Sequence, residues 1–425
     1  MSQVVKSKGL LSILILGSGN VVGTLISALA LILFSRFMGP TEFGLFSAAF
    51  ATMQILVRLA DLGTNMATER AIARVHGQDN YLADRLMRTA FWFKLLVTTL
   101  TLTIAWIFSP WIAHSFLHLE DVQLIHLAIL TSIGTVFFEY STIVFQSTQH
   151  FAAVARITIA QALGKLIFGL IFITQGMLNA SSALLIYGIL PGIGAFLGWN
   201  YRVLTSFSLP ATWKKDLHTI LVVAKWTLIA ALSATLADNV DTLLVQSLLS
   251  SYDTGIWSGA VRIATFANVI GWSVGSVLSV RVAKYQSREH LHAYLAKAWK
   301  LSLAIFVLIM LSLPLASLAI RLTIGSAYLS STVPLQILLF STAITGAITP
   351  YVALFYLFDK PQYYALAGII QTLVLIVGDL LTIPSYGLLG SAWTRVGVRL
   401  AIMVFTLIYA RSAYVGYFRT HDRQK

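Results

Sequence analysis

The chain has 425 residues, of which 57% are hydrophobic and 11% are charged, and its mean hydropathy is +0.81. Soluble domains carry roughly 45–50% apolar and about 25% charged residues, so this composition excludes a water-soluble enzyme and indicates an α-helical membrane protein. The formal net charge is +13. Cations beside membrane spans usually record topology, so we expect no nucleic-acid partner. Cysteine is absent from the sequence, which excludes disulfides and thiolate chemistry.

Apolar runs of about 20 residues, the length needed to cross roughly 30 Å of hydrocarbon, recur along the chain. The first follows Lys6 and Lys8 and runs on past Ala28. It is longer than the apolar core of a cleavable signal peptide, about 7–15 residues, so we expect it to be retained as a span. In chain order the predicted spans are 11–34, 43–65, 89–109, 123–146, 152–174, 183–201, 222–246, 256–280, 301–320, 334–357, 363–383 and 388–411. The sequence therefore predicts an all-α polytopic membrane protein with about twelve transmembrane helices.

The positions of the Lys and Arg residues predict the orientation of these spans. Of 29 such residues, 20 lie in one alternating set of connections, whereas the other set holds only Arg36 and Arg321. Cytoplasmic connections carry the excess of positive charge, so this pattern places both termini in the cytoplasm. We expect a multi-pass membrane protein of this orientation.

The two halves of the sequence resemble each other on either side of the connection 206–221. When Gly44 is aligned with Gly255, Phe46 meets Trp257 and Ser47 meets Ser258. Six spans in each half give two bundles of the same orientation, 1–205 and 222–425, joined by 206–221. Parallel repeats of this kind are typical of transporters whose substrate path runs between two pseudo-symmetric bundles.

Several ionisable residues fall inside the predicted spans, where each costs about 2.5–3.5 kcal/mol on insertion scales. Lys94 and Lys225 lie near predicted cytoplasmic ends, and we expect them to extend toward the membrane surface. Arg58 and Asp61 are spaced i,i+3, so they can pair along one helix face. Such a pair is compatible with a structural role and with a substrate contact.

The other intramembrane charges lie deeper, and two interpretations of them remain open. They can form buried ion pairs that lock helices together. Alternatively, they line a hydrated cavity whose cations receive an anionic substrate while its carboxylates bind a coupling Na⁺ or proton. Guanidinium groups suit phosphate because they offer paired donors and stay charged. In the second interpretation the substrate-binding residues are Arg58, Lys165, Arg262, Arg395 and Arg399, and the ion-coupling carboxylates are Glu139, Asp238, Asp241 and Asp379.

Three short motifs resemble those of a known family. Residues 39–47 read GPTEFGLFS and resemble the GPxEFGLYS motif that follows the first span of polysaccharide-biosynthesis flippases. Asp61-Leu62-Gly63 resembles their DLG motif, and residues 241–260 resemble their DxLLIG…GxYxxA stretch. By these motifs the chain is similar to the Wzx-like exporters of the MOP superfamily, which are related to MATE drug exporters and lipid II flippases.

The resemblance implies a flippase of the bacterial cytoplasmic (inner) membrane that moves an undecaprenyl-pyrophosphate-linked oligosaccharide from the inner to the outer leaflet by alternating access. It implies coupling to Na⁺ or H⁺, with no other cofactor, and contacts with membrane lipids, a polymerase and a chain-length regulator. It also implies that Arg58 and Arg262 are cavity arginines, and that a sodium site is formed by Asp238, Asp379 and Thr394. Asn20 in the first span, where the lipid II flippases have arginine, departs from the pattern.

Two other functions compete with this one. A MATE-like cation-coupled exporter of small molecules would share the fold. When Lys94 and Lys225 are set aside, five intramembrane cations against five carboxylates do not decide between the two functions. A membrane-bound polysaccharide polymerase or ligase usually needs a large extracytoplasmic loop, whereas the longest such connection here has about 13 residues. Its His114 and His118 could ligate a metal if the segment were helical, but a solvated turn is favoured. Gly192, Gly194 and Gly198 are interpreted as helix-packing residues.

Overall fold

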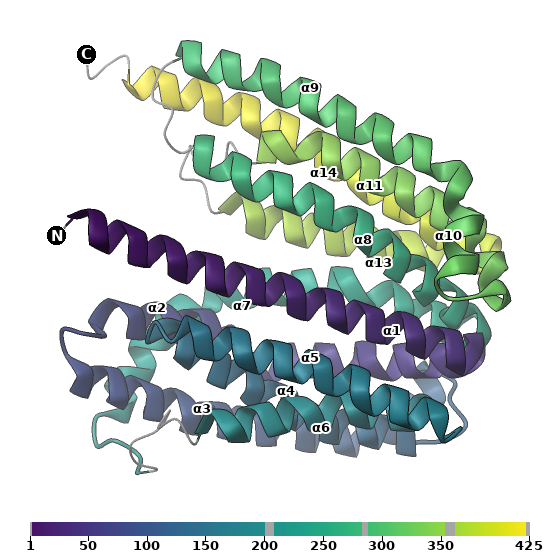
Figure 1. The fold of residues 1–425 in the computed structure, drawn as a ribbon, viewed down its shortest axis with the longest axis horizontal. Helices are drawn as coiled ribbons and strands as arrows, with labels where there is room; N and C mark the ends of the chain where they lie inside the picture. Colours follow the sequence, from purple (N-terminus) through teal and green to yellow (C-terminus); the bar gives the residue numbers. More distant parts are fainter. Residues whose placement is uncertain (1, 200–207, 283–287, 353–361, 422–425) are drawn as a thin grey trace. The chain divides into compact units, whose positions relative to one another are not determined.

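The computed structural model describes residues 2–199, 208–282, 288–352 and 362–421, and every regular element within these ranges is helical (Figure 1). The all-α fold is thus confirmed. Cations of three predicted cytoplasmic connections, Arg202, Lys284 and Lys360, lie outside the described residues. In chain order the elements are α1 (Ser2–Asp61), α2 (Thr64–Val75), α3 (Asn80–Ile107), η1 (Trp111–Phe116), α4 (Gln123–Ser147), α5 (Phe151–Thr174), α6 (Ala180–Trp199), α7 (Trp213–Leu248), α8 (Ser251–Val282), α9 (Arg288–Ser312), η2 (Leu313–Leu315), α10 (Ala316–Leu322), η3 (Ser326–Ser331), α11 (Thr332–Val352), α13 (Gln362–Tyr386) and α14 (Leu388–His421).

Helix α1 contains the first two predicted spans, separated by a kink at Gly39. Gly39 has φ 76° and ψ 171°, and Pro40 follows it inside the helix. A positive φ is accessible to glycine without a steric penalty, and proline removes a backbone donor, so the Gly-Pro pair breaks the helix here. The connection between these two spans is therefore a one-residue break.

The described helices follow the predicted spans in order. Nine helical segments of the described residues are long and apolar enough to cross a membrane, and one of them, Gly19–Asp61, has 43 residues and suffices for two crossings. The twelve predicted spans fall on α1 (twice), α3 to α9, α11, α13 and α14. Boundaries differ: α3 begins at Asn80 and α7 at Trp213, so the first turns of α7 lie in the predicted connection 206–221.

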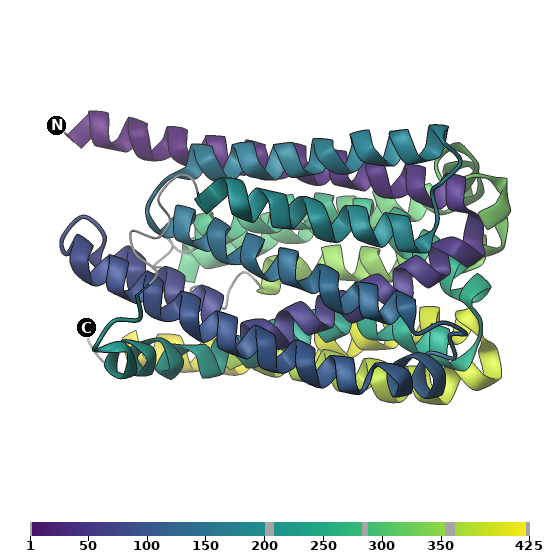
Figure 2. The same ribbon diagram turned by 90° about the horizontal axis from the view of Figure 1, so that it is seen from below.

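The chain divides into two compact units, Met1–Thr235 and Leu236–Lys425. In the first unit α1 packs against α5, and α4 packs against α6 (Figures 1 and 2). Helices α4 and α6 approach closely: a Cβ on Gly194 would lie 2.9 Å from the ring of Phe138, and one on Gly192 would lie 3.4 Å from Cα of Gly134. The packing role predicted for Gly192 and Gly194 is confirmed. The surroundings of Gly198 lie outside what the structure describes.

A buried apolar core holds α2, α3, α4 and the start of α7 together. Its members include Ile72, Met87, Tyr140 and Ile220, all at most 9% exposed. The Tyr140 hydroxyl donates a hydrogen bond to the Met87 carbonyl over 2.7 Å, which satisfies the only polar atom of that buried side chain. The short helix α2 is therefore fixed against the longer helices that follow it.

In the second unit α11 packs against α8, α9 and α14, and α13 packs against α14. Residues that align between the halves of the sequence have similar environments, each in its own unit. Phe46 and Trp257 are both 0% exposed, and Ser47 and Ser258 are both buried.

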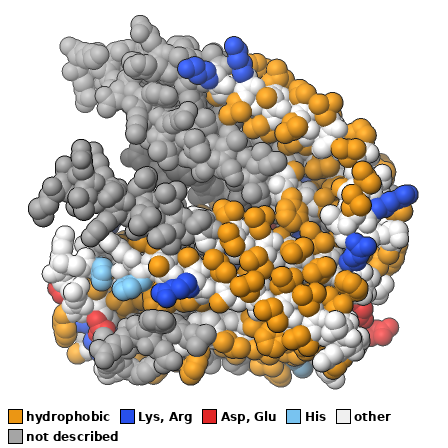
Figure 3. All heavy atoms as spheres, in the orientation of Figure 1, with side chains coloured by type: hydrophobic (Ala, Val, Ile, Leu, Met, Phe, Trp, Pro, Cys, Tyr) orange, Lys and Arg blue, Asp and Glu red, His pale blue; other side chains and the backbone are white. Residues whose placement is uncertain are grey.

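Large apolar side chains point outward along the helices. Leu96, Ile107, Leu311 and Leu381 are 66–71% exposed. On the face shown in Figure 3, hydrophobic side chains cover most of the described surface between the helix ends. An apolar surface of this extent is expected of helices surrounded by lipid. The protein is a multi-pass membrane protein.

Candidate functional site

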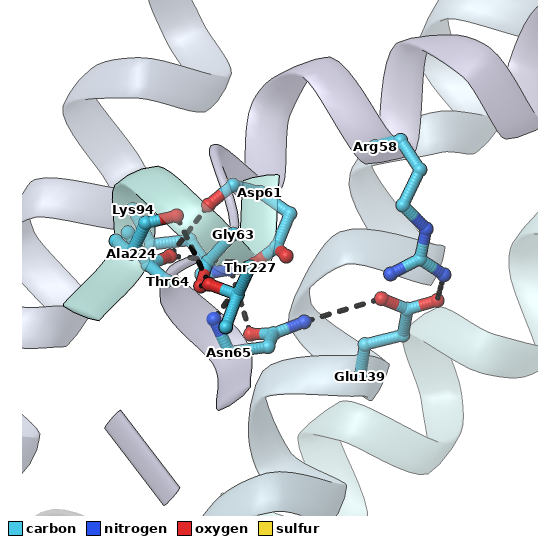
Figure 4. Close-up of polar contacts among 9 residues, drawn as sticks. All are labelled: Arg58, Asp61, Gly63, Thr64, Asn65, Lys94, Glu139, Ala224 and Thr227. Carbon is cyan, nitrogen blue, oxygen red and sulfur yellow. Dashed lines mark hydrogen bonds and ion pairs between the residues drawn. The ribbon is translucent and has the colours of Figure 1, made fainter. Parts of the chain in front are cut away.

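The first unit contains a group of charged side chains at the junction of α1 and α2, here called the N-terminal charge cluster: Arg58, Asp61, Asn65, Lys94 and Glu139 (Figure 4). Asp61 ends α1, and its Oδ1 accepts hydrogen bonds from the amide of Asn65 over 3.0 Å and from the hydroxyl of Thr64 over 3.3 Å. The carboxylate thereby satisfies an amide in the first turn of α2, a group that has no partner within its own helix.

Lys94 is the buried cation of this cluster. Its Nζ lies 2.5 Å from Oδ1 of Asp61 and 2.8 Å from the side-chain oxygen of Asn65, and the residue is 2% exposed. The prediction that Lys94 extends to the membrane surface is wrong. The side chain of Lys94 instead points into the protein, where Asp61 at the end of α1 and Asn65 on α2 bind its ammonium group.

Arg58 pairs across helices. One of its guanidinium nitrogens lies 2.7 Å from Oε1 of Glu139 on α4, and the two side chains are 27% and 25% exposed. The predicted pairing of Arg58 with Asp61 is wrong, because Arg58 pairs with a residue of α4 and Asp61 pairs with Lys94 of α3. The side-chain Nδ2 of Asn65 donates to Oε2 of Glu139 over 3.2 Å, and Asn65 thereby connects the two ion pairs.

A cavity of about 310 Å³ adjoins the N-terminal charge cluster. Arg58, Asp61 and Glu139 line it, together with Glu69 of α2. Burial raises the pKa of the Glu69 carboxyl, and neighbouring Arg70 opposes that shift. The cavity wall thus carries both signs of charge.

Helix α7 packs directly against the break between α1 and α2. Gly63 has φ 71°, and a Cβ placed on it would lie 2.3 Å from the backbone nitrogen of Leu228. The Thr227 hydroxyl donates to the Gly63 carbonyl over 2.6 Å. Only glycine fits this position, because both the backbone conformation and the contact exclude a side chain.

Lys165 on α5 lies apart from the N-terminal charge cluster. Its ammonium group is 4.4 Å from the ring centroid of Tyr187 on α6, a cation–π contact. Within the described part of the chain, no carboxylate lies at ion-pair distance from it.

The second unit holds the other predicted site residues, here called the C-terminal charge cluster: Asp238, Asp241, Arg262, Asp379, Arg395 and Arg399. At its centre Nε of Arg395 on α14 donates to Oδ2 of Asp241 on α7 over 2.6 Å, and a second guanidinium nitrogen contacts the same oxygen. Asp241 is 0% exposed. The guanidinium also lies 5.9 Å from the ring centroid of Trp257 on α8. Arg395 is therefore held by protein groups on two neighbouring helices.

Arg399, one turn further along α14, is placed differently. Its one described hydrogen bond is a long contact of 3.5 Å to the side-chain oxygen of Gln371 on α13. Among the described residues no carboxylate forms an ion pair with it, and Asp238 acts on it only from beyond that distance. Arg262 is half-buried on α8 and acts electrostatically on Asp238.

Asp379 on α13 and Thr394 on α14 lie together, as the predicted ion site requires. Asp379 is 0% exposed, and the hydroxyls of Ser391 and Thr394 lie beside its carboxylate. Neither carboxylate oxygen receives a hydrogen bond of good geometry from a described group. Asp238, the third predicted member, is exposed on α7, and Arg395 acts electrostatically on both carboxylates.

No group of three or more metal-ligating side chains occurs among the described residues. The segment that holds His114 is a π-helical turn, and Nδ1 of His114 contacts the carbonyl of Leu119 over 2.9 Å. His118 lies beyond this turn, so the regular α-helical spacing needed for a pair of ligands is not present.

Three contributors were not predicted: Asn65, Gln371 and Thr227. Asn65 follows Asp61 by four residues, and Gln371 is a polar residue in the middle of an apolar run, so both positions carried a signal. Thr227 carried none, because hydroxyls are common in membrane helices, where they bond to their own backbone.

Comparisons with known proteins agree with this architecture. A family model described as "Polysaccharide biosynthesis protein" matches residues 10–278. The probable low-salt glycan biosynthesis flippase Agl15 of Haloferax volcanii is 19% identical over 396 residues, which cover 92% of this chain and 80% of that protein.

Two solved structures have the same fold. The lipid II flippase MurJ in an inward closed conformation has a TM-score of 0.75 at 12% identity, covering 95% of this chain and 90% of that one. An inward-facing multidrug resistance MATE family transporter of the MOP superfamily has a TM-score of 0.72 at 18% identity, covering 94% and 96%. The chain belongs to the polysaccharide biosynthesis protein family, a family of flippases and not of enzymes, and has the MATE/MurJ-like fold of the MOP superfamily.

Proposed function

We propose that this protein moves an undecaprenyl-pyrophosphate-linked oligosaccharide, such as an O-antigen, capsule or exopolysaccharide repeat unit, across a bacterial inner membrane by alternating access. Both termini lie in the cytoplasm in this proposal. A polymerase and a chain-length regulator act on the product. Family membership supports the general activity, and the placement of Arg399 supports an anionic substrate.

Arg399 carries the proposal because no carboxylate of the described residues forms an ion pair with it. Neighbouring Arg395 has Asp241 as its ion-pair partner, whereas Arg399 has only the long contact to Gln371 among described groups. A guanidinium away from water needs hydrogen-bond acceptors and an opposite charge. A pyrophosphate supplies both, and its oxygens match the paired donors of arginine.

Lys165 in the first unit is likewise a cation without an ion-pair partner among the described residues. The face of the Tyr187 ring stabilises its ammonium group but leaves the positive charge in place. Arg58 and Arg262 are further candidates for contact with the substrate.

Asp379 and Thr394 are the proposed residues for the coupling ion. Neither oxygen of the buried Asp379 carboxylate has a hydrogen-bond partner of good geometry among the described groups. The hydroxyls of Ser391 and Thr394 lie beside the carboxylate, and the Thr382 hydroxyl lies 3.0 Å from that of Thr394. Oxygen donors of this type suit a hard cation such as Na⁺, and the carboxylate alone suits a proton. Transport that is indifferent to Na⁺ and to pH, and is unchanged by Asp379→Asn, would exclude this role.

A MATE-like exporter of cationic small molecules is the alternative. Its fold is the same, and carboxylates line the cavity of the first unit. However, Asp61 forms an ion pair with Lys94 and Glu139 forms one with Arg58, so Glu69 is the one lining carboxylate without an ion-pair partner among the described residues. The geometry therefore favours the flippase.

Purified protein in liposomes tests the proposal. A fluorescent prenyl-pyrophosphate oligosaccharide is placed in both leaflets, and its accessibility to an added glycosidase is followed over time. We expect the wild type to make the inner pool accessible within the assay, and empty liposomes to keep about half protected. Uptake of an organic cation such as ethidium, with no movement of the lipid-linked glycan, would identify the exporter instead.

A further inference from the structure

The first unit contains a second cavity, of about 460 Å³, which no step of the proposed transport uses. It lies between α2, α3 and the first turns of α7, and is here called the basic cavity. Four cations line it: Arg70, Arg74, Arg85 and Lys215. Apolar side chains, among them Leu86 and Val223, form the rest of its wall.

The two carboxylates at the basic cavity are already bound to other groups. Asp216 accepts two hydrogen bonds from Arg85, from Nε over 3.1 Å and from a terminal nitrogen over 2.7 Å, and one from Thr212 over 3.1 Å. Asp79 caps α3 by accepting from the amide of Leu82 over 2.9 Å. Arg85 and Asp216 thus neutralise each other and fix the start of α7 to α3.

The remaining cations have no such partners. Arg70 and Arg74 are exposed and spaced i,i+4, so they lie on one face of α2, and Lys215 approaches from α7. Within the described part of the chain none of these three side chains forms a hydrogen bond or an ion pair. Cations of the predicted cytoplasmic connections mostly record topology, but these three converge on one hollow. Two guanidinium groups on one face are well suited to phosphate oxygens.

The apolar wall narrows the class of ligand. A free inorganic anion would gain nothing from Leu86 and Val223, whereas a lipid can place its phosphate on the cations and its first apolar atoms on that wall. Helix α2 follows the end of the second predicted span, and α3, which begins at Asn80, leads into the third predicted span, 89–109. The cavity therefore lies at the predicted cytoplasmic surface of the membrane. This is the depth of lipid phosphates.

We infer that the basic cavity binds the phosphate headgroup of a membrane lipid at the cytoplasmic surface. The headgroup of an anionic phospholipid and the pyrophosphate of the lipid-linked glycan share this chemistry. If the glycan carrier is the ligand, the inference rests on the proposed function, and the cavity is where the carrier first docks before it enters the transport path.

Binding to full-length protein in dodecyl maltoside tests the inference without any transport step. Microscale thermophoresis is carried out with three probes: farnesyl pyrophosphate, dioctanoyl phosphatidylglycerol and inorganic pyrophosphate. The test variants are R70Q/R74Q and K215Q. The matched controls are K214Q, at the exposed neighbour of Lys215 outside the cavity, and R156Q, at an exposed cation of α5.

We expect one of the lipid probes to bind wild type and both controls equally. We expect it to bind R70Q/R74Q at least about tenfold more weakly, a loss of about 1.4 kcal/mol in binding free energy, because the variant lacks two guanidinium groups that donate to phosphate oxygens. A selective loss for farnesyl pyrophosphate identifies the carrier, and a selective loss for phosphatidylglycerol identifies a bilayer lipid. Equal affinity of all variants for both lipids, or binding of inorganic pyrophosphate alone, overturns the inference. Failure of the flipping assay leaves these outcomes unchanged.

Discussion

Neutralising Asp61 should strongly destabilise the first unit. Asp61→Asn keeps the oxygen that accepts from the Asn65 amide, so the start of α2 stays capped. It removes the charge that balances Lys94, whose Nζ would then be buried at 2% exposure with only amide oxygens as partners. Breaking a buried ion pair in this way costs about 3–5 kcal/mol.

Substitution of Lys94, the other member of the pair, gives a second loss in the free energy of unfolding, and the two losses together allow the interaction energy to be calculated. Lys94→Met leaves the Asp61 carboxylate with donors from Asn65 and Thr64, so we expect a loss near about 3 kcal/mol, the lower end of that range. The double variant K94M/D61N contains neither charge. Its loss should be smaller than the two single losses combined by about 2–3 kcal/mol, the coupling typical of contacting residues in one network.

Unfolding in dodecyl maltoside with increasing SDS, followed by tryptophan fluorescence, measures these free energies. The matched control is Lys225→Met, which removes an exposed lysine of α7. Single losses below about 1 kcal/mol, or losses that simply add in the double variant, would refute the assignment of Lys94 and Asp61 as a buried ion pair.

Two further predictions concern α2 and its neighbours. Gly63→Ala should cost at least about 2 kcal/mol of stability, because its Cβ would overlap the α7 backbone and its φ is 71°. Gly77→Ala, with φ 84° but open space around the Cβ, should show only the smaller conformational cost. Equal losses for the two variants in SDS titration would contradict the close contact between Gly63 and Leu228. Because burial raises the pKa of Glu69 above its ordinary 4.5, the folded state holds that proton more tightly, so the wild type should lose stability as the pH rises from about 4.5 through the higher folded value. Glu69→Gln should therefore match the wild type below pH 4.5 and be the more stable protein at neutral pH, and a variant that is less stable at neutral pH would show that the charged carboxylate is favoured.

The sequence was sufficient to predict which segments are helices and where the charges lie along them. The apolar runs predicted a connection between residues 34 and 43, and the Gly39-Pro40 break lies within it. The alignment of the two halves predicted a repeat, and the aligned residues Phe46 and Trp257 are both buried. These properties are local, because they follow from the length of an apolar run or from the backbone preference of glycine and proline.

Partners across helices could not be predicted in the same way. Periodicity shows which face a residue occupies but not which helix lies opposite. Arg58 and Asp61 share a face, yet one pairs with α4 and the other with α3. The interpretation of Lys94 failed for the same reason, since its partners Asp61 and Asn65 lie on other helices. The pairing of Asp379 with Thr394 followed from resemblance to a family and not from periodicity.

In the proposed transport cycle Arg399 receives a phosphate group of the substrate, and the flipping rate of Arg399 variants in liposomes measures that role. Arg399→Gln should reduce the rate by about 10–100-fold, because a hydrogen bond to a charged group contributes about 1.5–3 kcal/mol and 1.4 kcal/mol is tenfold. Arg399→Lys, which keeps the charge but loses the paired donors, should fall between Arg399→Gln and the wild type. Wild-type rates for Arg399→Gln, measured on protein that folds and inserts normally, would exclude a phosphate-binding role for Arg399.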